Sequence, residues 1–123
     1  MKTLESVKKQ TFPLYEHIII DANSTDGSKE TILKYEKENP HLTFWSSEPD
    51  KGIYDGMNKG IKKAKGEYLY FLNSGDNLTE DVLLKISFDN TKYIYGNIRF
   101  TGGRKNREEK APCKADLIFF LTK

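Results

Sequence analysis

The sequence lacks the features that mark several classes of protein. It has a single cysteine, Cys113, among 123 residues, which excludes an intramolecular disulfide framework and suits a reducing compartment. We recognise no signal peptide and no run of about 18 apolar residues, so we expect none of these residues to span a membrane. The charges nearly cancel, at a net charge of +2, and give no reason to expect nucleic acid as a partner.

The composition that remains is typical of a globular protein. Hydrophobic residues make up 37% and charged residues 31% of the chain. Its length predicts one domain, residues 1–123, near the lower limit for a complete α/β enzyme.

Strand-like and helix-like segments alternate along the chain. The pattern predicts helices at 3–10, 28–39, 53–65 and 79–87, and strands at 16–21, 42–45, 67–72 and 93–100. We expect Thr79 to cap the last helix and Asp81 to lie in its first turn. The alternation predicts a mostly parallel sheet with helices on both faces and an antiparallel addition near Phe100.

Both ends of the sequence resemble cuts through a larger fold. The chain opens inside a predicted helix with no strand before it, and it closes on the apolar run 117–121. A strand at 18–21 without a neighbour on one side leaves an open hydrogen-bonding edge. We expect that edge to be covered by a second copy of the chain or by the 117–121 segment.

Three aspartates follow predicted strands or stand in the loops after them. They are Asp21, Asp50 and Asp76, and in a parallel sheet these loops emerge at one edge, where α/β proteins bind ligands. A hard divalent cation takes oxygen ligands and shares them with substrate phosphates. An aspartate at a strand end is also a common turn former. The three together favour a ligand site over three separate turns.

Three ordered blocks of this sequence resemble glycosyltransferase family 2. They read IIIDANSTDGS at 18–28, SEPDKGIYDGMNKG at 47–60 and YFLNSGD at 70–76. The resemblance extends over residues 3–96. It implies a truncated GT-A type, Rossmann-like fold that binds a nucleotide-diphospho-sugar together with Mn or Mg. The implied reaction transfers a hexose from that donor to a saccharide or lipid-linked acceptor, such as a growing cell-surface polysaccharide.

The resemblance also implies roles for individual residues. Asp21 matches the family's base-contacting aspartate, and Asp76 matches the last aspartate of its metal-binding motif. This chain has Asn73 and Gly75 where further carboxylates are common, so we expect Asp76 alone to carry charge to the metal. The remaining residues that we expect to bind the nucleotide-sugar are Asp50, Lys51, Gly52, Asn58 and Asn73.

The same resemblance places two parts of the machinery outside this sequence. The family's first strand would precede Met1, and its general base would follow Lys123. We therefore assign no catalytic residue here and expect the chain alone to be inactive. We expect the protein to be cytoplasmic or to lie at the inner face of the membrane. The alternative is a non-catalytic, flavodoxin-like domain that binds Mg or serves in signalling, although such a domain has no reason to carry the 47–60 block.

Overall fold

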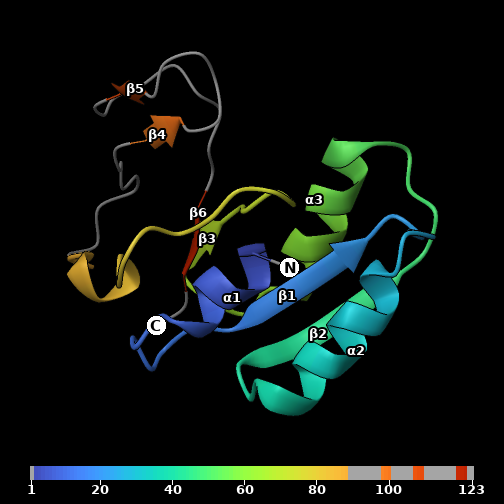
Figure 1. Cartoon of the computed structure of the whole chain (residues 1–123), viewed down its shortest axis with the longest axis horizontal. Coiled ribbons are helices and arrows are strands. Elements are labelled where there is room, and N and C mark those ends of the chain that lie inside the picture. Colours follow the sequence, from blue (N-terminus) through green and yellow to red (C-terminus); the bar gives the residue numbers. More distant parts are fainter. Residues whose placement is uncertain (1, 89–97, 101–106, 110–118, 122–123) are drawn as a thin grey trace. The chain divides into compact units, whose positions relative to one another are not determined.

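The computed structural model describes residues 2–88, 98–100, 107–109 and 119–121. The chain forms two compact units, one made of residues 1–86 with 118–123 and the other of residues 87–117 (Figure 1). The first unit carries every candidate residue of the predicted ligand site.

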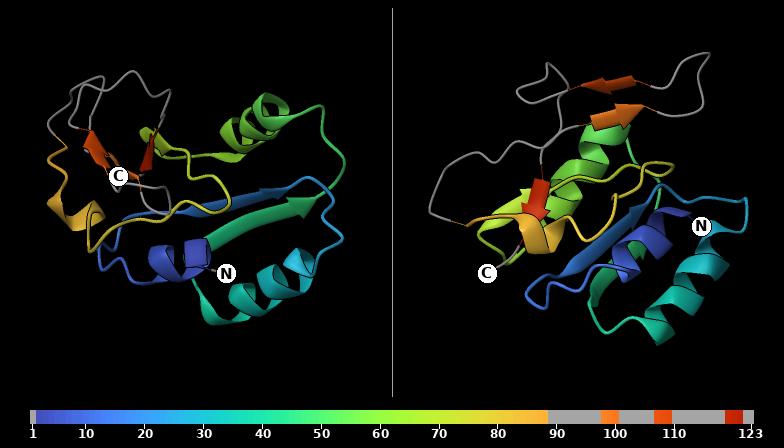
Figure 2. Two further views of the ribbon diagram at one scale, coloured as in Figure 1. Left: turned by 45° about the horizontal axis from the view of Figure 1, so that its top comes forward. Right: turned by 60° about the vertical axis from the view of Figure 1, so that its left-hand side comes forward.

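The first unit is a small α/β structure. Its elements are α1 (Lys2–Lys8), β1 (His17–Asp21), α2 (Ser28–Glu38), β2 (Leu42–Ser47), α3 (Ile53–Lys63), β3 (Tyr68–Tyr70), the short 3₁₀ helix η1 (Leu83–Lys85) and β6 (Phe119–Leu121). Strands β1 and β2 are parallel, with Ile19 opposite Trp45. Helix α3 covers one face of this pair, and α1 and α2 cover the other (Figure 2). The predicted α/β class, with a parallel pair between helices, is confirmed.

Apolar side chains from the helices on the α1 and α2 side form most of the buried core. In α2, Ile32 and Tyr35 are buried and lie three residues apart, on one face of the helix. In α1, Leu4 and Val7 are buried at the same spacing. On the other face of β1, α3 packs against the strand at Gly60, where a Cβ would lie at an ordinary van der Waals distance of 3.8 Å from Ile20. This contact places α3 beside β1.

The apolar run at the end of the chain pairs with a different strand from the one expected. Strand β6 lies antiparallel to β3, with Tyr70 opposite Phe119 and Tyr68 opposite Leu121. The prediction that the 117–121 segment would cover the open edge of the 18–21 strand is therefore wrong for its described residues. Among the strands that the structure describes, β1 pairs with β2 alone.

The helix predicted at 79–87 is also wrong, since only the turn of η1 forms there. Glu80 has a φ of 49°, a left-handed conformation that a right-handed helix cannot contain. The carboxylate of Asp81 accepts hydrogen bonds from the backbone N–H and hydroxyl of Thr11. The segment is further held by Gln10, which donates to the Glu80 carbonyl at 2.6 Å and accepts from the Leu83 N–H at 3.1 Å. Tertiary hydrogen bonds to the end of α1 thus replace helical ones.

The second unit contains an antiparallel strand pair. Strands β4 (Ile98–Phe100) and β5 (Arg107–Glu109) place Phe100 opposite Arg107. Antiparallel pairing near Phe100 agrees with the prediction, although β4 and β5 form a two-stranded sheet of their own. The rest of the predicted 93–100 strand and Cys113 lie outside the described residues.

A buried polar network joins β1 to α2. The Asn39 side-chain oxygen accepts from the His41 N–H at 3.0 Å, which turns the amide nitrogen toward the Tyr35 hydroxyl. The Tyr35 oxygen accepts from Asn39, so its own proton is available to the Nδ1 atom of His17, 3.0 Å away. Burial lowers the pKa of His17 from 6.5 to about 4, and the imidazole is therefore neutral near pH 7.

This network predicts an acid-sensitive stability. As pH falls below 6.5, His17 takes up a proton in the unfolded chain before it does so in the folded chain. The free energy of unfolding should therefore fall between pH 6.5 and pH 4 and level off below. The largest possible loss in the free energy of unfolding is about 3 kcal/mol, since one pKa unit is worth about 1.4 kcal/mol. Urea titrations at several pH values measure the decline. The same decline in His17→Gln would contradict the assignment.

Candidate functional site

A cavity of about 280 Å³ lies within the first unit. Side chains of β1, α3 and β3 line it, together with Val7 of α1 and residues that follow β3. Most of the wall is apolar, and Asp50 and Asn73 contribute polar groups. Small-molecule sites commonly combine apolar walls with a few polar groups in this way. The cavity brings together two candidates, Asp50 and Asn73, that are more than 20 residues apart in the sequence and belong to different blocks.

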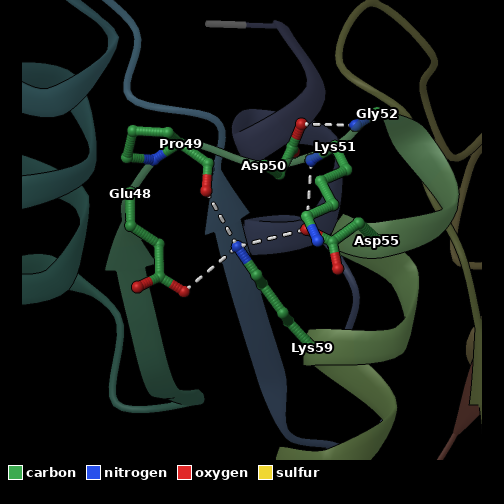
Figure 3. Close-up of polar contacts among 7 residues, drawn as sticks. All are labelled: Glu48, Pro49, Asp50, Lys51, Gly52, Asp55 and Lys59. Atoms are coloured by element: carbon green, nitrogen blue, oxygen red, sulfur yellow. Dashed lines mark hydrogen bonds and ion pairs between the residues drawn. The ribbon is translucent and has the colours of Figure 1, made fainter.

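Asp50 is held in a loop, residues 48–52, that connects β2 to α3 (Figure 3). Its Oδ1 atom accepts from the Gly52 N–H at 2.9 Å, and Gly52 has a φ of 111°, a conformation that favours glycine. Its Oδ2 atom would lie 3.4 Å from a Cβ at Gly56. The Asp50 carboxylate therefore lies against the first turn of α3, next to Gly56.

Asp21 lies at the end of β1 and is 8% exposed. Its carboxylate accepts from the backbone N–H of Ser24 at 3.0 Å and from the hydroxyls of Ser24 and Ser47. Burial disfavours the charged form, but these hydrogen bonds outweigh it, so the pKa of Asp21 is lowered. The residue joins the ends of β1 and β2, and it is not among the residues that line the cavity.

Asp76 lies in a turn after β3. The turn closes through a bond from the Asp76 N–H to the Asn73 carbonyl at 3.0 Å, and Gly75 takes a φ of 100° between them. Thr3 of α1 accepts from the Gly75 N–H at 3.0 Å and so fixes the turn. The Asp76 side chain is exposed. Burial and then the negative charge of Asp76 raise the pKa of Tyr70 in the cavity wall, so the carboxylate lies within electrostatic range of the cavity.

The other candidate residues are more exposed to solvent. Lys51, Gly52 and Asn58 are exposed, and none of them lines the cavity. Space is open where a Cβ of Gly52 would stand. Our sequence reasoning assigned no role to Lys59 and Asp55, although their spacing of four residues on a helix is a recognisable signal for an ion pair. The structure pairs them, at 3.5 Å.

The described residues offer few ligands to a cation by themselves. Within the described part of the chain, no three His, Cys, Asp or Glu side chains gather as metal ligands. One exposed carboxylate, Asp76, could bind a divalent cation whose remaining ligands come from water and a diphosphate. The predicted dependence on Mn or Mg stays a prediction.

Comparison with known proteins identifies the family of this chain. The family model described as glycosyl transferase family 2 matches residues 1–122. The chain belongs to this family. Membership implies a GT-A type α/β fold, in agreement with the parallel β1–β2 pair and its covering helices. It also favours the transferase interpretation of the sequence over the flavodoxin-like one.

Individual relatives match shorter stretches. An uncharacterized glycosyltransferase of Mycobacterium tuberculosis is 42% identical over 76 residues, 61% of this chain and 28% of its own length. TuaG of Bacillus subtilis, provisionally named as a teichuronic acid biosynthesis glycosyltransferase, is 36% identical over 83 residues, 68% of this chain and 33% of its own. A Mycobacterium bovis protein named as a PGL/p-HBAD biosynthesis glycosyltransferase is 28% identical over 101 residues, 77% of this chain and 40% of its own.

The chain thus spans between 28% and 40% of the length of these curated relatives. No solved structure matches it. In the part of the chain that the structure describes, no helix has the length and apolar character needed to cross a bilayer.

The contacts of Asp21 predict a structural cost when its carboxylate is removed. Asp21→Ala should lower the free energy of unfolding by about 2–3 kcal/mol, because three donors lose a buried, charged acceptor. Asp26→Ala is the control, since Asp26 is an exposed aspartate in the same loop and accepts from the backbone N–H of Ser28 at 3.1 Å, so its replacement should cost less than that of Asp21. Thermal and urea denaturation measure both variants. Equal stability of the two would show that Asp21 does not join the strand ends.

Proposed function

We propose that this chain is the donor-binding part of a glycosyltransferase that uses a nucleotide-diphospho-sugar. One observation carries the proposal. Asp50 and Asn73 come from two separate family-like blocks and line the same cavity. The family match over residues 1–122 supports it. A binding site assembled from both blocks is what a donor site in this family would require.

Each remaining candidate has a property that suits its proposed role. Asp21 has a lowered pKa and is therefore ionised near pH 7, as a carboxylate that accepts hydrogen bonds from a nucleobase needs to be. The open space at Gly52 admits a close approach of ligand to backbone. The exposed Lys51 beside it offers a positive charge to donor phosphates. Asn58 on α3 offers an amide near the same loop.

The chemistry of sugar transfer explains why a carboxylate after β3 matters. Departure of a nucleoside diphosphate builds negative charge on the leaving group, and a divalent cation, when bound, would neutralise part of that charge. Asp76 would hold the cation, with Asn73 close by in the same turn. The acceptor hydroxyl must also lose a proton to a base, and no residue of this chain is assigned that task. Within these residues the function is to bind and orient the donor.

The acceptor is proposed from the relatives alone. The names of two relatives assign them to teichuronic acid and PGL/p-HBAD biosynthesis, so we propose a saccharide or lipid-linked acceptor and a role in polysaccharide assembly. Such acceptors suit a protein at the cytoplasmic side of a membrane. Inactivity of this chain by itself remains a prediction.

Nucleoside diphosphate binding tests the proposal. Uridine or guanosine diphosphate should raise the melting temperature, and should raise it further with Mn. At ten times Kd the expected stabilisation is about 1.4 kcal/mol. Asp76→Asn should keep the fold and lose only the Mn-dependent part, because the amide keeps the size but not the charge.

Asp26→Asn is the matched control, because it removes an exposed carboxylate from a different loop. A Mn effect that survives in Asp76→Asn would remove Asp76 from the site. A Mn effect without any nucleotide dependence would favour a metal-binding domain with no donor sugar.

A further inference from the structure

The side chain of Lys59 joins the loop that carries Asp50 to α3. Its ammonium group lies 3.2 Å from the Glu48 carboxylate and 3.5 Å from the Asp55 carboxylate, and it donates to the Pro49 carbonyl at 3.1 Å (Figure 3). An ammonium group has three protons. Lys59 thus has three oxygen partners within 3.5 Å, two of them in the loop and one on its own helix.

The partners of Lys59 continue the connection toward Asp50. The Asp55 carboxylate that it contacts also accepts from the Lys51 backbone N–H at 3.1 Å. That bond is the largest cause of the lowered pKa of Asp55. The next backbone N–H, of Gly52, donates to Asp50. One cation thus fixes the start of the loop directly and its middle through Asp55.

Lys59 has a less exposed side chain than the two acidic residues that it contacts. Its side chain is 25% exposed, against 57% for Glu48 and 36% for Asp55. Desolvation disfavours the charged amine, but its two carboxylate partners outweigh this and raise the pKa of Lys59. The ammonium group of Lys59 is therefore charged near pH 7.

The contacts also balance charge beside the cavity. Glu48, Asp50 and Asp55 are acidic and stand within eight residues of one another. Without Lys59, two of these carboxylates would lose their cationic partner next to a site proposed to accept an anionic diphosphate. Repulsion between like charges would then both loosen the loop and oppose the ligand.

We propose that Lys59 is a positioning residue, which holds the 48–52 loop on α3 so that Asp50 faces the cavity and the donor diphosphate can approach. The proposal rests on the proposed function for its ligand and on the observed contacts for its geometry. The oxygen partners of the Lys59 ammonium group belong to the protein, so we place its effect on the donor in the position of the loop.

The test compares Lys59→Met with Lys59→Arg and with the control Lys62→Met, an exposed lysine on the same helix. Two readouts are needed. Amide hydrogen exchange by NMR reports the Lys51 and Gly52 N–H groups, and calorimetry reports the Kd of uridine and guanosine diphosphate. In Lys59→Met, exchange at both amides should rise and Kd should weaken about fivefold to tenfold. Lys59→Arg should restore most of both, and Lys62→Met should match the unmodified chain.

The outcomes separate this proposal from the proposed function. Unchanged amide exchange in Lys59→Met would show that Lys59 does not hold the 48–52 loop on α3. Raised exchange with an unchanged Kd would show that the position of the loop does not affect binding of the diphosphate. If the unmodified chain binds neither diphosphate, the proposed function fails. The exchange data still test whether Lys59 holds the loop on α3. If Lys59→Met does not fold, Glu48→Gln removes the ion pair between Lys59 and Glu48. Unchanged amide exchange in that variant would overturn the proposal.

Discussion

The parallel pairing of β1 with β2 is the constraint on which the site depends. Their ends are joined by the Asp21 carboxylate, which binds the hydroxyl of Ser47, and by the Glu48 N–H, which donates to the Asp21 carbonyl at 3.0 Å. The chain leaves β2 at this point and enters the 48–52 loop. The pairing therefore determines where the loop starts, and the packing of α3 on β1 determines where it ends.

The carboxylates near the ends of β1 and β2 are stabilised in two different ways. Asp21 is buried and held by neutral hydroxyl and amide donors, which keep it ionised without a directly bonded cation. Glu48 and Asp55 are more exposed and share a cation, Lys59. The first arrangement stabilises the strand ends, and the second orients a loop.

Much of the fold follows from local sequence, because strand and helix periodicity are local properties. The pattern predicted the segments of α1, β1, α2, β2, α3 and β3 within a few residues. It missed the pairing of β6 with β3 and the loss of helix at 79–87, since both depend on partners distant in sequence, such as Gln10 and Thr11. The motifs indicated candidate residues for a site, and that assignment stays a prediction. They could not indicate that Asp50 and Asn73 line one cavity, or that Lys59 holds the loop, because those facts depend on the packing of α3.

The central claim is that the 47–60 and 70–76 blocks form one donor site. Its most direct test is a titration of the isotope-labelled chain with uridine and guanosine diphosphate in the presence of Mg, followed by amide chemical shifts in NMR. The account predicts the largest shifts at residues 50–56 and 73–76 together, saturating with a common Kd. Shifts confined to one block, two different Kd values, or shifts centred on α2 would contradict it.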